Sequence, residues 1–211
     1  DIFVRTYDKK KEFTKSFAFR MKTDSEKKLT RNTGFYERTS KLTRNFVDAR
    51  GFWLPNDYTK HGVINEYTAC REKAVVIDLS SLRKFEILGP DAEELMNYTL
   101  TKNIKKLSVG QIVYSAMCYE NGTMFDDGTL LRLSETGFRW VCGDEFAGEW
   151  LKEQAKKKNL KVVIKNSTDQ INNLSVQGPN SRKILEKIIF TPPTQPTISE
   201  LQWFRFTICR L

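Results

Sequence analysis

Two adjacent carboxylates, Asp126 and Asp127, are the side chains of this sequence best placed for acid–base chemistry. They follow Tyr119–Phe125, in which Asn121-Gly122 between apolar segments is a strong signal for a β-hairpin. Successive side chains of a strand point to opposite faces of a sheet. We therefore expect one acid to point into a cleft and the other to cap the backbone or face solvent.

Few other residue types compete for such a role. The only histidine is His61, so acid–base work must fall to carboxylates, lysines, tyrosines or cysteines. The four cysteines are far apart and form no C-x-x-C pair: Cys70, Cys118, Cys142 and Cys209. This spacing disfavours a metal site and a disulfide framework, and it favours a reducing compartment, either the cytoplasm or the mitochondrial matrix.

Composition predicts a folded globular protein. The 211 residues are 39% hydrophobic and 12% aromatic, which is enough to bury a core. No apolar run approaches the roughly 20 residues that span a bilayer, so we expect a soluble protein without membrane association. The sequence starts at Asp1 without a signal-peptide pattern, which gives secretion no support.

The net charge of +9 is concentrated near the start of the chain. Residues 1–50 contain 14 basic and 7 acidic residues, an excess of 7, whereas the remainder has an excess of only 2. We interpret residues 1–34 as a basic arm. A solvated surface segment is the favoured explanation, and attraction to nucleic acid is the alternative.

Hydrophobic periodicity indicates strands that alternate with helices. The expected strands are 51–55, 75–79 (buried), 84–88, 109–119, 130–133, 138–141, 160–164 and 171–176, and the expected helices are 62–74, 92–100, 146–158 and 181–189. Gly89-Pro90 and Gly178-Pro179 each connect a strand to a helix, a repetition that predicts two α+β units with helices packed on antiparallel sheets. Residues 191–196 form a proline-rich connector, and 201–211 form a last strand-like segment.

Several of these segments follow one known order. They are Gly51-Phe-Trp-Leu-Pro55, Ile77-Asp-Leu-Ser80, Gly89-Pro-Asp-Ala92, Leu107-Ser-Val-Gly-Gln111 with Tyr114, Glu120-Asn-Gly-Thr-Met-Phe-Asp-Asp127 and Val176-Gln-Gly-Pro179. In this order the sequence resembles the glycine-cleavage T-protein (aminomethyltransferase) family from about residue 35 to 211. That family also includes folate-dependent demethylases of small methylated compounds.

The resemblance implies a tetrahydrofolate-binding α+β fold with antiparallel sheets. Residues 35–190 would form the folate-binding region, as two interleaved α+β subdomains, and 191–211 would lead to a C-terminal part that this sequence lacks. The matching positions imply that Asp126 is the catalytic carboxylate beside the folate nitrogens. Tyr114, Leu82 and Val141 would line the same cofactor site, and no metal is implied.

Some family positions differ here. Leu82 stands in place of a methionine, and Gly143 in place of an asparagine that meets the pterin. The wording Asp78-Leu-Ser-Ser-Leu82 also departs from the T-protein pattern. A later Arg-Thr-Gly-Tyr-Thr-Gly-Glu segment would begin after Leu211. These differences favour a demethylase-like relative that holds part of the folate site.

The leading functional hypothesis is therefore transfer of a methyl or aminomethyl group to tetrahydrofolate. The donor would be a small methylated substrate or an aminomethyl carrier protein. The alternative is a non-catalytic or regulatory relative, or one subunit of a split enzyme whose partner chain completes the fold. The Lys-Gly-Cys-Tyr-x-Gly-Gln signature of folate-dependent tRNA-modifying relatives is absent, which disfavours a nucleic-acid partner.

Overall fold

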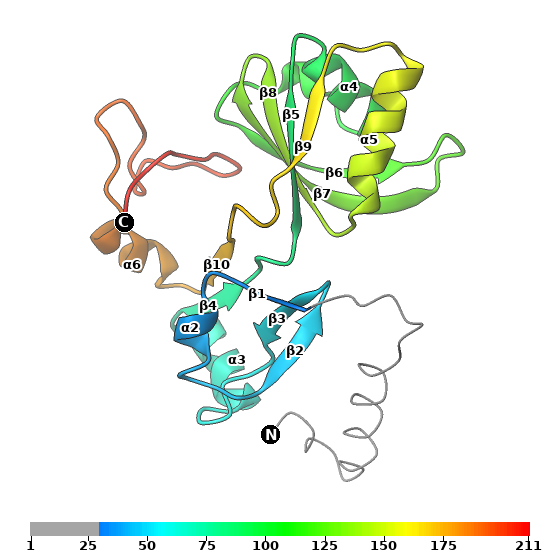
Figure 1. Ribbon diagram of the computed structural model, residues 1–211. Coiled ribbons are helices and arrows are strands. Elements are labelled where there is room, and N and C mark those ends of the chain that lie inside the picture. The colour runs from blue at the N-terminus through cyan, green and yellow to red at the C-terminus, as the bar shows by residue number, and fades with distance from the viewer. Residues whose placement is uncertain (1–29) are drawn as a thin grey trace, which may run out of the picture. The chain divides into compact units, whose positions relative to one another are not determined.

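The computed structural model describes residues 30–211 (Figure 1). The chain divides into two compact units, the first formed by residues up to Ser81 together with Asn172–Ser181, and the second by Leu82–Ile171 together with Arg182–Leu211. The predicted basic arm lies outside the described residues, apart from residues 30–34. None of the helices within residues 30–211 is long and apolar enough to span a membrane.

Within its described residues, from 30 onward, the first unit contains two small sheets and two helices. Its elements are β1 (Arg31–Asn32), α2 (Tyr36–Thr39), β2 (Phe46–Ala49), β3 (Phe52–Pro55), α3 (Val63–Glu72), β4 (Val75–Asp78) and β10 (Leu174–Gln177). One sheet has the order β1-β3-β2, with β1 parallel to β3, and the other pairs β4 with β10 in antiparallel fashion. The prediction that the β4 segment is buried is wrong, because Val76 is 53% and Ile77 45% exposed on opposite faces of this two-stranded sheet.

The second unit is built on one five-stranded antiparallel sheet with the order β6-β7-β8-β5-β9. Its elements are β5 (Arg83–Leu88), α4 (Ala92–Thr99), η1 (Ile104–Lys106), β6 (Ile112–Cys118), β7 (Met124–Ser134), β8 (Gly137–Cys142), α5 (Phe146–Lys157) and β9 (Val163–Asn166). Helix α6 (Ser181–Ile188) and an irregular C-terminal segment follow β10. The antiparallel α+β architecture predicted from the sequence is confirmed.

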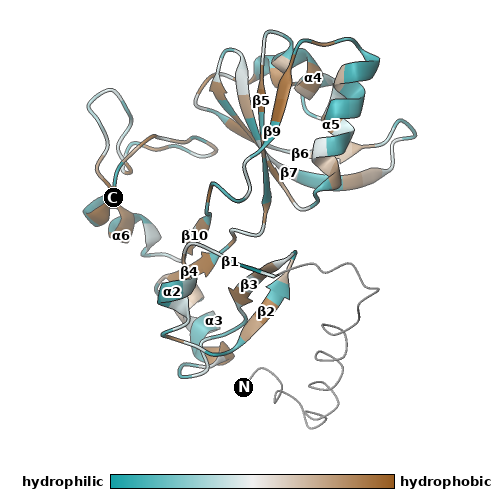
Figure 2. Cartoon of the chain, in the orientation of Figure 1, coloured by the Kyte–Doolittle hydropathy of each residue, from teal (hydrophilic) through white to brown (hydrophobic). Residues whose placement is uncertain are grey.

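The core of the second unit lies between one face of this sheet and helices α4 and α5 (Figure 1). Trp140, Phe138 and Leu130 on the strands and Leu95 and Leu151 on the helices are completely buried. Polar residues of α5 lie on its outer side, which is teal in Figure 2. The opposite face of the sheet is not covered by these two helices.

Arg132 of β7 ties the sheet to α4. Its guanidinium is buried and forms an ion pair with Glu93 at 2.6 Å, and it donates to the Leu107 carbonyl at 2.8 Å.

We expect Arg132→Ala to lower the free energy of unfolding by about 2 kcal/mol. This is below the range for a fully buried ion pair because Glu93 is partly exposed. Urea denaturation tests this. The exposed Lys152–Glu149 pair is the control, and an equal loss in Lys152→Ala would contradict the assignment.

The two Gly-Pro turns behave alike in the structure. Gly89 and Gly178 both have positive φ angles, 138° and 122°, and both lie against backbone carbonyls. An added Cβ would come within 2.4 Å of the Lys161 oxygen at Gly89 and within 2.6 Å of the Lys73 oxygen at Gly178. Only glycine satisfies both conditions, which explains why each strand is joined to its helix by this residue.

Two other predictions need correction. The strand expected over 201–211 is not formed, and residues there make only isolated bridges, Gln111 with Arg205 and Phe190 with Arg210. The strand expected over 130–133 is the second part of a longer strand, β7, of 11 residues. Asp126 and Asp127 lie within this strand.

Candidate active site

A tight turn aligns the two strands that hold the acidic pair. The Tyr119 amide donates to the Thr123 carbonyl at 2.9 Å, and the Asn121 side chain accepts from the Thr123 amide at 3.0 Å. Gly122 supplies the positive φ of 83° that such a turn requires. The hairpin predicted from Asn121-Gly122 is thus confirmed.

The register of this hairpin places the acids on opposite faces. Asp127 pairs with Ala116, and Asp126 pairs with Met117, a completely buried core residue. Further along, Tyr114 pairs with Thr129, which in turn pairs with Val141 of β8. Paired residues of an antiparallel sheet point the same way and successive residues alternate. Tyr114, Val141 and Asp127 therefore share the face that α4 and α5 leave open.

Tyr114 and Asp127 are in direct contact on this open face. The Tyr114 hydroxyl donates a hydrogen bond to Oδ2 of Asp127, and the tyrosine side chain is 51% exposed. Val141 is partly buried on the same face two strands from Tyr114, and the partly buried Leu82 lies one position before β5. Two of the four predicted site residues, Tyr114 and Val141, thus share this face of the sheet.

Asp126 does not lie on that face. It is only 8% exposed, on the helix side of the sheet. Its Oδ1 accepts the amides of Asp127 at 2.9 Å and Gly143 at 3.3 Å, and its Oδ2 accepts the Asp144 amide at 3.1 Å. The structure therefore gives Asp127, and not the predicted Asp126, the position beside Tyr114.

Sequence reasoning also missed a polar group on the same face. Lys84 pairs with Val141 in the sheet and is 2% exposed, with its ammonium donating to the Leu82 carbonyl at 2.8 Å. Next to it, Glu86 accepts from Arg139 at 2.7 Å and from Ser167 at 2.9 Å. Lys84 and Glu86 lie two positions apart along β5, and this alternation could have indicated a polar face from the sequence. The β5 side of this face is thus polar, and Lys84 lies directly opposite Val141.

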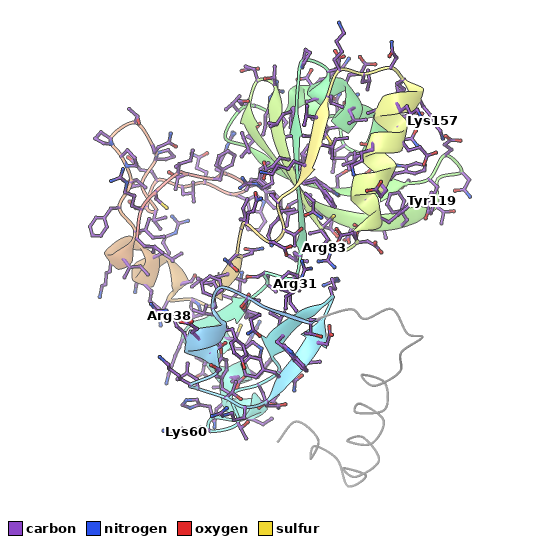
Figure 3. All side chains as sticks on the ribbon, in the orientation of Figure 1. Arg31, Arg38, Lys60, Arg83, Tyr119 and Lys157 are labelled. Atoms are coloured by element: carbon purple, nitrogen blue, oxygen red, sulfur yellow. The ribbon has the colours of Figure 1, made fainter. Side chains whose placement is uncertain are left out.

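Aromatic packing anchors the end of the hairpin that leads to the site. The Tyr119 ring lies 4.7 Å from Phe125 and 5.4 Å from Trp150 of α5. Lys157 of the same helix forms an ion pair with Glu120 at 3.3 Å, at the end of the unit where Figure 3 labels Tyr119 and Lys157. The aromatic contacts fix β6 and β7 to α5 and so hold the strand that presents Asp127, whereas the exposed Lys157–Glu120 pair contributes little.

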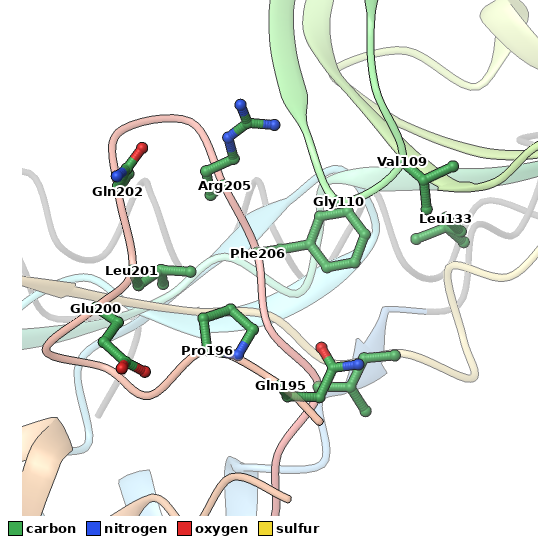
Figure 4. Close-up of a pocket in the computed structure, with 11 residues that line it drawn as sticks. Val109, Gly110, Leu133, Gln195, Pro196, Glu200, Leu201, Gln202, Arg205 and Phe206 are labelled. Atoms are coloured by element: carbon green, nitrogen blue, oxygen red, sulfur yellow. The ribbon is translucent and has the colours of Figure 1, made fainter. Parts of the chain in front are cut away.

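A groove of about 420 Å³ lies at the opposite end of the β6–β7 pair (Figure 4). Its lining includes Val109, Gly110 and Leu133 from the sheet and Arg205 and Phe206 from the C-terminal segment. The Ile112 amide donates to the Phe204 carbonyl at 2.9 Å and holds this segment against β6. None of the predicted site residues lines this groove.

Cys142, at the end of β8, is held as a neutral thiol. Burial, followed by the negative charge of Asp126, raises the pKa of the Cys142 thiol well above its usual value. Because the folded-state pKa is raised, this group favours the native state below the usual thiol pKa of about 8.5, and its contribution is lost as the pH rises above it.

We therefore expect Cys142 to resist alkylation in the native protein. At about pH 8, iodoacetamide should modify the exposed Cys209 at least roughly 100-fold faster than Cys142, since the thiolate is the reactive form. Mass spectrometry of tryptic peptides measures both rates. Comparable rates in the folded protein, against a urea-unfolded control, would contradict the assigned environment.

Comparison with known proteins identifies the family to which this fold belongs. The family described as the GCVT N-terminal domain matches residues 35–210. The chain belongs to the GCVT family. A crystal structure of the glycine cleavage system aminomethyltransferase T from Bartonella henselae is similar to it with a TM-score of 0.69 and 26% identity, over 83% of this chain and 46% of that one. The T-protein resemblance inferred from the motifs is thus confirmed.

The relatives of this GCVT chain are named as enzymes. A trimethylamine-oxide aldolase of Ruegeria pomeroyi is 51% identical over all 211 residues, which make up 27% of its length. An aminomethyltransferase of Symbiobacterium thermophilum is 33% identical over 82% of the chain and 46% of its own length. The chain therefore spans less than half of the length of these relatives.

Proposed function

We propose that this GCVT chain binds tetrahydrofolate on the open face of its five-stranded sheet and takes part in transfer of a one-carbon unit to it. The observation that supports this most strongly is the contact between Tyr114 and Asp127 on that face. This contact brings an aromatic hydroxyl and an accessible carboxylate together on the adjacent strands β6 and β7.

The chemistry of these residues fits a reduced pterin. Such a ring is flat and presents several N–H donors at its edge, and a carboxylate such as Asp127 is an acceptor suited to them. Tyr114 adds an aromatic surface and a hydroxyl, while Leu82 and Val141 add apolar walls. The same residues would hold and orient the cofactor, with Asp127 against its nitrogen-bearing edge.

When bound, tetrahydrofolate supplies nitrogen nucleophiles for one-carbon units. Positive charge develops on nitrogen as a new carbon–nitrogen bond forms, so a fixed carboxylate lowers the energy of that transition state. Asp127 can also accept the proton that the nitrogen loses, as a general base. The Tyr114 hydroxyl, which donates to Asp127 Oδ2, keeps that carboxylate in one orientation.

The proposal extends to the source of the one-carbon unit. An aldolase releases an aldehyde, and every carbon of trimethylamine oxide is a methyl carbon. Cleavage of one such methyl gives dimethylamine and formaldehyde, which together contain all the atoms of the substrate. The 51% identity to a trimethylamine-oxide aldolase therefore supports formaldehyde as the one-carbon unit here. The aminomethyltransferase relatives support an aminomethyl donor as the alternative.

A non-catalytic role is the competing function. It is supported by Gly143, which stands where the resemblance places a pterin-contacting asparagine. That role predicts that the protein does not bind reduced folates, whereas the proposed function requires such binding.

Calorimetric titration with 5-formyltetrahydrofolate, a stable reduced folate, tests the proposal. We expect saturable binding by the wild type, and about 5-fold weaker binding by Tyr114→Phe because one hydrogen bond to the acid is lost. Tyr98→Phe, on α4, is the matched control and should bind as the wild type does. Absence of binding by the wild type would overturn the proposed function.

A further inference from the structure

The buried acid Asp126 carries a second inference, which rests on the proposed function. A buried carboxylate is costly unless its oxygens are hydrogen-bonded. Here both oxygens accept backbone amides, from Asp127, Gly143 and Asp144 at 2.9, 3.3 and 3.1 Å. Bonds from N–H groups to an ionised carboxylate are about twice as strong as neutral ones. Asp126 is therefore committed to the backbone around it.

These three amides belong to two segments that meet at the site. One is the backbone of Asp127 itself, on β7. The other is the turn from β8 into α5, where Gly143 and Asp144 directly follow the strand that holds Val141. The Asp144 side chain in turn accepts the Phe146 amide at 2.8 Å, at the start of α5. Asp126 thus joins the strand of the folate-facing acid to the turn beside Val141.

Cys142 adds a contact next to this arrangement. It is the last residue of β8, directly before the turn, and is 2% exposed. Its thiol donates to the Asp144 carbonyl at 3.6 Å and so connects the end of β8 to the same turn. The three hydrogen bonds to the Asp126 carboxylate all come from backbone N–H groups.

We propose that Asp126 is a positioning residue, which fixes the Asp127 backbone and the Val141–Asp144 segment relative to one another without touching folate. Asp127 is the acid that meets the cofactor, and Asp126 determines where Asp127 and Val141 stand. Loss of Asp126 should therefore impair folate binding in molecules that remain folded.

Asp126→Asn is the sharpest variant because it preserves the size of the side chain. Its NH₂ group replaces one acceptor oxygen by a donor, which opposes the backbone N–H groups. We expect folate affinity to fall about 10-fold and the amides of Gly143 and Asp144 to exchange with solvent at least 10-fold faster. Calorimetry with 5-formyltetrahydrofolate and hydrogen exchange measured by NMR give the two readouts, at a temperature where circular dichroism shows the variant to be folded.

Folate affinity and amide exchange in Asp126→Asn are interpreted together. Faster exchange with unchanged folate affinity would mean a merely structural role and would overturn the proposal. Weaker folate binding with the Gly143 and Asp144 amides still protected would mean that Asp126 contacts folate directly, which would also overturn it. A wild-type protein that binds no reduced folate would overturn the proposed function first, and the positioning role with it.

Cys142→Ala provides a second route if Asp126→Asn does not fold. It removes the thiol that donates to the Asp144 carbonyl and leaves the three amide bonds to Asp126 in place, so we expect folate affinity to fall only about 2- to 3-fold, with a smaller rise in Gly143 exchange. Glu120→Gln, on the exposed end of the hairpin, should change neither readout. An effect of Glu120→Gln as large as that of Cys142→Ala would overturn the specific link.

Discussion

Asparagine in place of Asp127 is expected to weaken binding of 5-formyltetrahydrofolate about 30-fold, the effect of losing a hydrogen bond to a charged group worth about 2 kcal/mol. The rate of one-carbon transfer should fall further, by about 100-fold, because the variant can neither accept a proton nor stabilise positive charge. Calorimetry measures the first quantity. The turnover of formaldehyde with tetrahydrofolate measures the second.

The exposure of Asp127 makes this variant easy to interpret. Its side chain packs into no core, and the Asp127 amide donates to Asp126 whichever residue is present. Stability should therefore change by less than about 0.5 kcal/mol, as for most surface substitutions. Glu120→Gln removes another exposed carboxylate from the same hairpin and serves as the control. Normal folate binding and turnover in Asp127→Asn would remove Asp127 from the site.

The second large effect is expected at Gly128, between Asp127 and Thr129. An added Cβ there would stand 2.2 Å from the Val141 carbonyl oxygen and 3.0 Å from the Trp140 ring. A backbone oxygen in a paired strand cannot move aside without breaking the ladder. We expect Gly128→Ala to lower the free energy of unfolding by about 3 kcal/mol, the upper part of the usual range for overpacking. Urea denaturation monitored by tryptophan fluorescence measures the loss.

Gly148 of α5 is the informative comparison. Its added Cβ would meet the Phe85 ring at 2.3 Å, a side chain that can shift, and alanine also favours the helix by about 1 kcal/mol over glycine. Gly148→Ala should therefore cost less, about 1 kcal/mol, because the two effects oppose one another. If Gly148→Ala proved as destabilising as Gly128→Ala, the distinction between a rigid and a movable neighbour would be contradicted.

Much of the second unit could be predicted because its signals are local. Asn121-Gly122 specified the hairpin, and Gly89-Pro90 specified the start of α4. The apolar periodicity of 146–158 specified α5. Each of these depends on neighbouring residues in sequence, and the structure confirms all of them.

The roles of the two acids could not be settled by alternation alone. Alternation shows that Asp126 and Asp127 face opposite ways, but not which of them shares a face with Tyr114. The hairpin register decides this, since Tyr114 opposite Thr129 places Asp127 on its face. The turn has three residues between Tyr119 and Thr123, and the strand pairing shifts by one residue between Met117 and Cys118. Beyond this shift, β6 and β7 pair as they would with a two-residue turn at Asn121-Gly122, so that shorter turn would have predicted the same partner for Tyr114.

Burial in the first unit and the end of the chain were less predictable. The apolar run 75–79 has the composition of a buried strand, yet β4 has β10 as its partner in a two-stranded sheet. The segment 201–211 has strand-like residues but forms only isolated bridges. In both cases the outcome depends on which other segments are available for pairing and packing, and composition does not contain that information.

The central claim is that folate binds the face of the sheet that α4 and α5 leave open, against Asp127 and Tyr114. A crystal structure of the protein with 5-formyltetrahydrofolate tests it most directly. We predict that the Asp127 carboxylate lies within hydrogen-bond distance of the ligand, about 3 Å, and that Asp126 keeps its bonds to the Gly143 and Asp144 amides. A ligand bonded to Asp126, or seated away from Tyr114, would contradict the account.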